Sequence, residues 1–295
     1  TEIKTKMKSL NEICFLIQAR TESVRVPEKI IRPFADTSLF EIAVKKILSS
    51  KIIPKENFYL FIRDERLIEI ANIHNAQTII RSEKSCEEPI DIYSLFEWRH
   101  TLKNLYKYYI MLNPCNAIVS IETIDKFVQD FTNSSANGMV AIVGGRNFIF
   151  GEDGRMLPKY NAPEEYRTSL ESKFLEKHFQ LANTLYAGQI EDIDKGIYLG
   201  TFQQPDDPQF WEMPANEFYD IDEKFQFDLA EQVYKMKFFK KSTPLAVEYL
   251  QGQLSALEYA INITKNKDSV DILTIRKNKI KEELSCLDVI ENLNV

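Results

Sequence analysis

A cluster of basic residues follows directly after a short apolar run near the start of the chain. The apolar run covers 13–17, and Arg20, Ser23, Arg25 and Lys29 come after it. Three cations within ten residues can surround a polyphosphate, while the serine hydroxyl and the loop N–H groups donate further hydrogen bonds. A solvent-exposed basic loop is an equally common use of such a segment. Taken alone, the cluster is compatible with a phosphate site and equally with a solvent-exposed loop.

A pair of aspartates, Asp220 and Asp222, forms a second candidate site within the segment 218–222. Residues two apart in an extended chain point to the same side. Two carboxylates on one side can bind a Mg²⁺ ion that also contacts phosphate oxygens and keeps several waters. Alternatively, Asp222 is the N-cap of the helix expected from Glu223 and Asp220 is an exposed charge. The pair by itself favours this alternative, because capping is the more common use of such an aspartate.

The elements around these two clusters alternate between strands and helices. Apolar runs of four to five residues predict strands at 13–17, 58–62, 77–80, 108–112 and 139–143. Helical spacing of apolar residues predicts helices at 39–48, after an Asp64 N-cap, at about 90–105 and near 121–131. Strands separated by helices need crossover connections. We therefore predict an α/β fold with three layers, in which helices flank a mostly parallel sheet. The basic loop then leaves the carboxyl end of the first strand, where open α/β sheets bind ligands.

The alternation stops after residue 143. Residues 146–155 have the pattern of a hairpin with an Asp-Gly turn. A helix is expected from about 164 to 178, a returning strand at 183–188, and a further helix at 223–235. The last fifty residues have the pattern of two helices that pack on the domain or on another subunit. We expect a domain at 1–244 with an insertion at about 145–190, and a C-terminal helical extension at 245–295.

Composition and charge argue against several classes of protein. A net charge of −7 disfavours a nucleic-acid binder with a general basic surface. No apolar run approaches the ~18 residues of a membrane span. The four cysteines form no CxxC pair, and the three histidines are too far apart for a zinc site. We therefore expect a reduced, cytoplasmic protein that binds neither nucleic acid nor membrane.

The two clusters together resemble the acylneuraminate cytidylyltransferase family, which includes the CMP-sialic acid synthetases. The loop matches at Ala19-Arg20, Ser23, Arg25, Pro27 and Lys29, and the second match is Asp220-Ile221-Asp222 with Phe227 and Leu229-Ala230-Glu231. Between them, Leu112-Asn113-Pro114 stands where relatives have leucine, a polar amide and proline, and Arg81 stands where many members have an arginine near the base. The resemblance spans about residues 12–235. The loop is also similar to those of SpsF-like and Kdo cytidylyltransferases.

The resemblance implies a nucleotidyltransferase that joins CMP from CTP to an acidic sugar and releases pyrophosphate. The acceptor class is a nonulosonic acid, such as a sialic, legionaminic or pseudaminic acid, and the cofactor is Mg²⁺ or Mn²⁺. The implied catalytic residues are Arg20 and Lys29, which hold the β and γ phosphates, and Asp222, the candidate base. The implied substrate-binding residues are Ala19, Ser23, Arg25, Arg81 and Asn113, and the implied metal ligands are Asp220 and Asp222. Lys29, as a loop lysine, is expected to be exposed and to contribute little to stability.

The resemblance also implies a homodimer, because part of the sugar site in the family comes from a partner subunit through the insertion at 145–190. Two alternatives stay open. The chain could transfer CMP to another acceptor, such as Kdo or a phosphonate. It could instead be a degenerate member that binds a nucleotide without catalysis. Thr21 and Glu22, where relatives have small residues, and Gln226, in place of an acidic residue, support this second alternative.

Overall fold

The computed structural model describes residues 7–87 and 91–238, together with scattered positions between 255 and 281. The chain divides into two compact units, Thr1–Ala230 and Glu231–Val295. The C-terminal extension expected at 245–295 lies outside the described residues except at the scattered positions. Those positions are helical, and among them Lys277 forms an ion pair with Glu258 at 3.0 Å. The domain boundary expected at 244/245 also lies outside the described residues.

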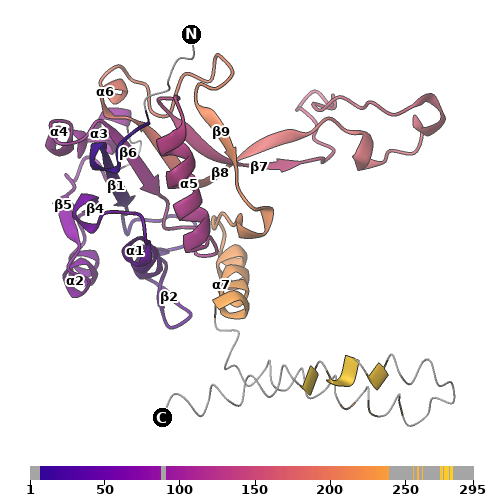
Figure 1. The fold of residues 1–295 in the computed structure, drawn as a ribbon, viewed down its shortest axis with the longest axis horizontal. Coiled ribbons are helices and arrows are strands. Elements are labelled where there is room, and N and C mark those ends of the chain that lie inside the picture. Colours follow the sequence, from indigo (N-terminus) through magenta and orange to yellow (C-terminus); the bar gives the residue numbers. More distant parts are fainter. Residues whose placement is uncertain are drawn as a thin grey trace. The chain divides into compact units, whose positions relative to one another are not determined.

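Within the described residues, seven strands form one sheet in the order β5-β4-β1-β6-β8-β7-β9 (Figure 1). Neighbouring strands are parallel except where β8 pairs, antiparallel, with β6 on one side and β7 on the other. The strands are β1 (Ile13–Gln18), β4 (Phe58–Ile62), β5 (Gln77–Ile80), β6 (Tyr108–Leu112), β7 (Met139–Gly145), β8 (His178–Gln189) and β9 (Gln209–Glu212). The predicted mostly parallel α/β sheet is confirmed, and β9 is an addition that the sequence patterns did not indicate. A small ladder pairs β2 (Pro33–Phe34) with β3 (Thr37–Ser38).

Helices cover both faces of the sheet, as predicted. Side chains of β1 alternate between two cores: Phe15 packs with the helices of one face, and Leu16 packs with those of the other. The first face carries α1 (Leu39–Ser49), α2 (Glu65–Ile73) and α5 (Ile121–Asn133), and the second carries α3 (Ile92–Leu95), α4 (Arg99–Leu102) and α6 (Ile190–Ile193). The helix α7 (Lys224–Phe238) follows the aspartate pair, and single 3-10 turns lie at Leu10–Glu12, Lys55–Asn57, Glu164–Tyr166, Ser172–Phe174 and Ala215–Glu217.

The prediction of one continuous helix at about 90–105 is wrong. Two short helices, α3 and α4, lie there instead, separated by Phe96, Glu97 and Trp98. Phe96 and Trp98 are both buried in the second core. Residues two apart lie on nearly opposite sides of a continuous helix, so burying both against one sheet requires a break.

Asp64 caps α2 as predicted, because its Oδ1 accepts a hydrogen bond from the Arg66 N–H.

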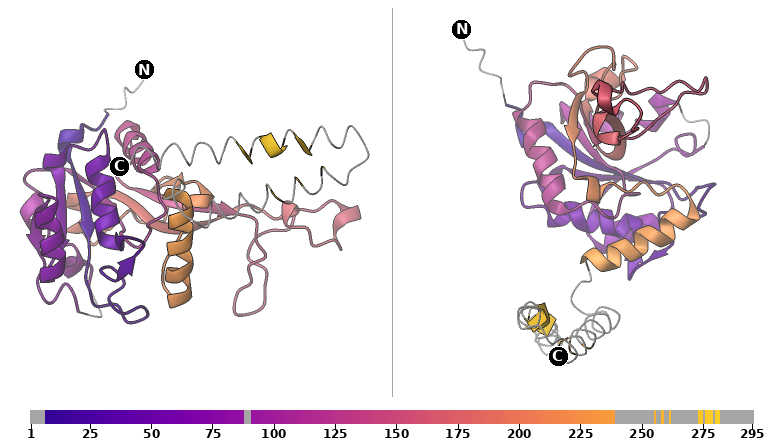
Figure 2. Two further views of the ribbon diagram at one scale, coloured as in Figure 1. Left: turned by 90° about the horizontal axis from the view of Figure 1, so that it is seen from below. Right: turned by 90° about the vertical axis from the view of Figure 1, so that its right-hand side faces the viewer.

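An arm, defined here as residues 146–177, leaves the sheet between β7 and β8 (Figures 1 and 2). The predicted hairpin is present: Phe150 bridges Met156, and Gly154 takes a φ of 75° in the turn. The helix predicted from 164 to 178 is wrong. Leu170 has a φ of 46°, which no α-helix accommodates, and β8 already begins at His178. Instead of forming a helix face, Tyr166 and Phe174 pack on each other with ring centroids 5.4 Å apart.

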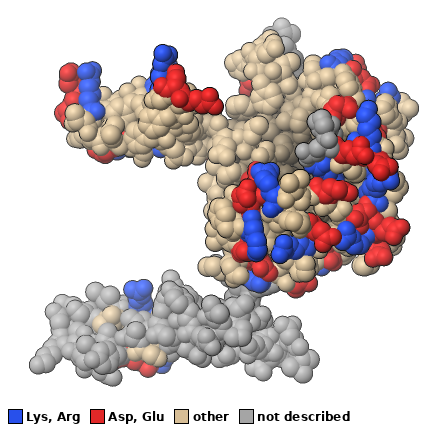
Figure 3. Space-filling view, turned by 180° about the vertical axis from the view of Figure 1, so that it is seen from behind, with Lys and Arg blue, Asp and Glu red and all other residues tan. Residues whose placement is uncertain are grey.

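The surface of the arm differs from that of the sheet domain. Ile149, Phe150, Leu157 and Leu170 are exposed along it. Figure 3 shows charged side chains crowded on the visible face of the sheet domain, whereas on the visible face of the arm the charged groups stand among larger uncharged areas. Among the described residues, no helix combines the length and apolar character that crossing a bilayer requires.

Candidate functional site

The basic loop and the aspartate pair meet at the carboxyl edge of the sheet. The Arg25 guanidinium donates from Nη2 to Asp222 Oδ1 at 2.6 Å, and Lys29 Nζ lies 3.9 Å from the same oxygen. Lys29 also donates to the Ile221 carbonyl. These contacts join two segments that lie almost two hundred residues apart in the sequence. The structure therefore brings together the groups predicted to bind phosphate and the groups predicted to bind metal.

Asp222 is not simply a helix cap. The side-chain oxygen of Gln226 accepts hydrogen bonds from the N–H groups of Asp222 and Glu223, both at 2.7 Å. Gln226 therefore caps the start of α7 and leaves the Asp222 carboxylate facing the basic loop. The Gln226 side chain therefore has a structural use of its own. Glutamine three residues after the N-cap is a known capping pattern, so the sequence did contain this signal.

A cavity of about 330 Å³ lies beside the basic loop, and it is called the phosphate cavity below after the ligand predicted for this loop. Six of the predicted site residues line it, namely Ala19, Arg20, Ser23, Arg25, Lys29 and Asn113. Cys115 lines it as well, and burial raises the pKa of the Cys115 thiol, while the nearby Lys29 ammonium acts in the opposite direction. The thiol therefore stays protonated and does not add negative charge to the cavity beside the basic loop.

Arg81 lies beneath the loop rather than in the phosphate cavity. It is 2% exposed, donates from Nη1 to the Ala19 carbonyl at 3.1 Å, and donates to the backbone and side chain of Ser85. Burial lowers the pKa of the Arg81 guanidinium. Arg81 also lines an adjoining cavity of about 290 Å³ that shares Arg20 and Asn113 with the first. Its main visible role is to hold Ala19, and the predicted contact with a base stays a prediction.

The loop is fixed to α2 by two contacts that the sequence analysis did not foresee. The Thr21 hydroxyl donates to Asp64 Oδ2 at 2.9 Å, and Arg66 pairs with Glu28 at 2.6 Å. Arg66 also holds the pKa of the Asp64 carboxyl at about 2, so this carboxylate is ionised at neutral pH. The Thr21 side chain therefore has a structural use. Glu22 is exposed at the rim of the cavity.

A buried network holds the aspartate segment against the end of β6. Asn116 Nδ2 donates to Thr184 Oγ1 at 2.8 Å and to the Glu217 carbonyl at 2.9 Å. Its Oδ1 accepts from the N–H groups of Ile118 and Val119. Asn116 and Glu217 were not predicted to take part in the site. The polar turn 113–116 was a signal, but its partners come from distant parts of the chain.

Replacing Asn116 with alanine is expected to destabilise the protein by about 2–3 kcal/mol, because buried donors and acceptors lose their partners. Urea unfolding followed by circular dichroism measures the change. Asn104→Ala is the matched control, because Asn104 is exposed, and it should leave the unfolding midpoint unchanged. An equal effect of the two substitutions would show that the network does not stabilise the fold.

The aspartate pair fits a magnesium ion that takes its remaining ligands from a substrate. Among the described residues, no group of three or more His, Cys, Asp or Glu side chains could hold a metal by itself. Asp220 and Asp222 both line a separate hollow of about 420 Å³, and Asp222 lies 3.9 Å from Lys29 on the wall of the phosphate cavity. Mg²⁺ is commonly bound by one or two carboxylates together with substrate phosphates and water. The donor set therefore suits Mg²⁺ bound with a nucleotide.

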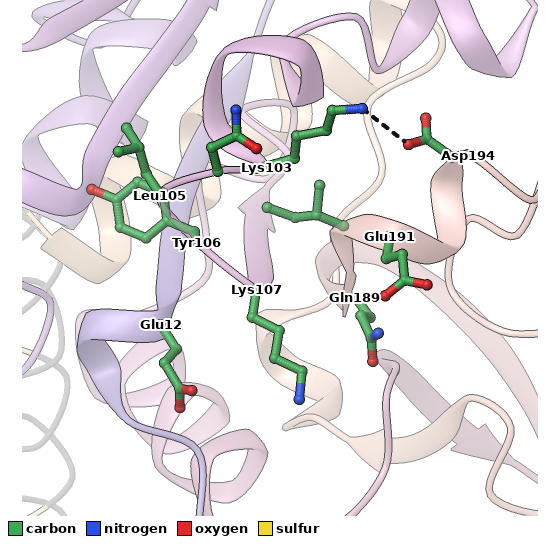
Figure 4. Close-up of a pocket in the computed structure, with 10 residues that line it drawn as sticks. Glu12, Lys103, Leu105, Tyr106, Lys107, Gln189, Glu191 and Asp194 are labelled. Carbon is green, nitrogen blue, oxygen red and sulfur yellow. Dashed lines mark hydrogen bonds and ion pairs between the residues drawn. The ribbon is translucent and has the colours of Figure 1, made fainter.

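A further hollow of about 510 Å³ lies at the opposite edge of the sheet, where β1 and β6 begin (Figure 4). Glu12, Lys107 and Glu191 face it, and Lys103 pairs with Asp194 at 3.4 Å on its rim. Glu12 already accepts a hydrogen bond from the Ser9 N–H. The mixed charges and the position away from the carboxyl edge give this hollow no clear ligand.

Comparison with known proteins adds a family and a fold. A family model described as cytidylyltransferase matches residues 14–243. The spore coat polysaccharide biosynthesis protein SpsF of Bacillus subtilis (strain 168) is 30% identical over 83 residues, which are 28% of this chain and 35% of that protein. The match therefore spans about a third of the length of that relative.

Three solved structures are similar at low sequence identity. CMP:2-keto-3-deoxy-manno-octonic acid synthetase complexed with CTP gives a TM-score of 0.56 at 11% identity, covering 77% of this chain and all of that one. The 4-diphosphocytidyl-2C-methyl-D-erythritol synthase from Anaerococcus prevotii gives 0.53 at 14%, covering 76% and 98%. A cytidylyltransferase from Leptospira borgpetersenii gives 0.50 at 15%, covering 83% and 95%. At these identities the likenesses establish the fold alone.

Proposed function

The chain belongs to the cytidylyltransferase family, and on that premise we propose that it transfers CMP from CTP to an acidic sugar. The proposed acceptor is a nonulosonic acid, and the second product is pyrophosphate. One observation carries the proposal: Arg25 and Lys29 converge with Asp222 beside a cavity at the carboxyl edge of the sheet. This arrangement provides both cations for phosphates and carboxylates for a magnesium ion.

The proposed reaction is a displacement at phosphorus. The anomeric hydroxyl oxygen bonds to the α-phosphorus of CTP, and the bond from that phosphorus to the oxygen leading to the β-phosphate breaks. Pyrophosphate leaves with the bonding electrons, and the hydroxyl proton is removed by a base. Such transfers depend mainly on positioning and charge neutralisation.

The residues of this chain divide these tasks between them. Lys29 and Arg20 hold the β and γ phosphates and stabilise the leaving pyrophosphate, with Ser23 and Arg25 as further donors. When bound between Asp220 and Asp222, Mg²⁺ would neutralise phosphate charge and acidify the attacking hydroxyl. Asp222 is the candidate acceptor of the hydroxyl proton.

The names of two similar proteins support a sugar acceptor. SpsF is named for polysaccharide biosynthesis, and one structural neighbour is named as the synthetase of a CMP-linked sugar acid and was solved with CTP. Kdo and phosphonates remain alternative acceptors. The structural uses of Thr21 and Gln226 weaken the degenerate alternative, because these departures leave the cavity and the carboxylates in place.

The test is CTP-dependent release of pyrophosphate in the presence of Mg²⁺, with sialic, legionaminic, pseudaminic and Kdo-type acids and a phosphonate as acceptors. Release with one acceptor would establish the activity and identify the substrate. Binding of CTP by calorimetry without release would favour the degenerate, nucleotide-binding alternative. Absence of both release and binding would overturn the proposal.

We further propose that the exposed apolar side chains of the arm make the protein a homodimer. Phe150 is 58% exposed, and neighbouring apolar side chains lie along the same arm. Phe150→Glu is expected to change the solution mass measured by light scattering from twice 34.4 kDa to 34.4 kDa. Ile73→Glu is the control, because Ile73 is 72% exposed on α2 and should not affect assembly. A monomeric wild-type protein would contradict the proposal.

A further inference from the structure

Asn183 lies at an irregularity of β8 next to the proposed metal site. Val140 of β7 faces Tyr186, but Ile142 faces Leu181, so two steps along β7 correspond to five steps along β8. Asn183 lies within the extra residues and has a φ of 48°. On the other side of β8, regular pairing with β6 ends at Leu112 and Leu185. Such bulges often redirect a side chain beside an active site.

Asn183 contacts both halves of the site through its side chain and its carbonyl. Its Nδ2 donates to Asp220 Oδ2 at 2.8 Å, and its Oδ1 accepts from the Tyr186 hydroxyl at 3.3 Å. Its carbonyl accepts from Asn113 Nδ2 at 2.8 Å. Asn113 lines the phosphate cavity, so Asn183 bridges that cavity and the carboxylate that would bind the metal.

We infer that Asn183 is a positioning residue that orients Asp220 for a divalent cation. The inference rests on the proposed function, because it assigns Asp220 to the metal. A carboxylate that ligates a metal through one oxygen is held in place when its other oxygen accepts a hydrogen bond. The Asn183 amide makes this contact from a fixed backbone, and the Tyr186 hydroxyl fixes the amide in turn.

The backbone at position 183 explains why asparagine suits it. A positive φ is strained for most residues, whereas asparagine and glycine adopt it readily. Only asparagine combines that conformation with a donor that reaches Asp220. Glycine at this position keeps the backbone and removes the amide, whereas alanine removes the amide and also strains the backbone.

The test compares Asn183→Gly with the wild-type protein in two assays. The first measures Mn²⁺ binding by electron paramagnetic resonance in the presence of a non-hydrolysable CTP analogue. The second measures the Mg²⁺ concentration that gives half-maximal pyrophosphate release. We expect both half-saturation concentrations to rise about tenfold or more. The affinity for the CTP analogue without metal should stay unchanged, because the amide contacts no phosphate-binding cation.

Two further variants separate positioning from structure. Asn75→Gly is the matched control, because Asn75 also has a positive φ, of 51°, but lies after α2. It should leave both metal assays unchanged. Asn183→Ala should raise the metal requirement as much as Asn183→Gly does and also lower the melting temperature.

Asp220→Asn completes the test, because a residue that acts through Asp220 has no further effect once that carboxylate is gone. Adding Asn183→Gly to Asp220→Asn should leave the half-saturation concentrations at the value of Asp220→Asn alone. Unchanged metal binding in Asn183→Gly, or additive effects in the double variant, would overturn the role of Asn183 while leaving the proposed function intact. A wild-type protein that binds no Mn²⁺ with the nucleotide and releases no pyrophosphate would overturn both.

Discussion

Lys29→Ala is expected to reduce CTP turnover by a factor on the order of 10³ or more, with the fold retained. The Lys29 side chain is only 12% exposed, and its ammonium lies 3.9 Å from Asp222 on the wall of the phosphate cavity. A cation held in this way is ready to stabilise charge on the leaving pyrophosphate without rearranging. Steady-state pyrophosphate release measures the loss. Lys51→Ala is the control, because Lys51 is exposed on the turn after α1.

The structure corrects the expectation that Lys29 is exposed and contributes little to stability. Its ammonium donates to the Ile221 carbonyl, so it ties the basic loop to the aspartate segment. Removing it should lower the free energy of unfolding by about 1–2 kcal/mol. Lys29→Arg keeps the positive charge and should recover part of the turnover. Wild-type turnover in a folded Lys29→Ala protein would count decisively against the site.

The strands and the site loops were predictable because their signals are local. The runs at 58–62, 77–80 and 108–112 are strands with those same bounds. The runs 58–62 and 108–112 are largely buried and apolar on both faces, as central strands of a parallel sheet are, whereas 77–80 is an edge strand. The basic loop and the aspartate pair were likewise recognisable as short segments. What local patterns could not provide was the order of the strands. β8 follows β7 in sequence but is inserted between β6 and β7.

That insertion explains the residues that sequence analysis missed. Asn183 meets Asp220, and Asn116 meets Thr184, because β8 lies against the end of β6. The spacing of residues within one segment does not indicate a contact with a distant segment. The helix predicted within the arm is absent for a related reason. The aromatic residues of the arm have a spacing compatible with a helix, but they pack on one another instead of on the sheet.

Asp222→Asn is expected to reduce turnover by a factor on the order of 10³, for a different reason from Lys29→Ala. Asp222 is proposed both to bind the metal and to accept the hydroxyl proton, and a neutral amide does each poorly. Pyrophosphate release at increasing Mg²⁺ concentration should therefore show a higher metal requirement as well as a lower maximum rate. Lys29→Ala should lower the maximum rate without this shift in the metal requirement. Asp228→Asn is the control, because Asp228 forms an ion pair with exposed Lys224 on α7.

The loss of turnover in Asp222→Asn should not come from unfolding. The ion pair with Arg25 joins side chains that are 59% and 36% exposed, and such pairs contribute at most about 1 kcal/mol. Arg25→Gln breaks the same ion pair but keeps the Asp222 carboxylate. The two variants should therefore unfold at nearly the same urea concentration. Because Arg25 is also proposed to contact the phosphates, Mn²⁺ binding is measured at saturating CTP analogue, where Asp222→Asn should weaken it and Arg25→Gln should leave it nearly unchanged. Equal Mn²⁺ binding by the two variants would assign Asp222 to holding the basic loop and would remove it from the metal site.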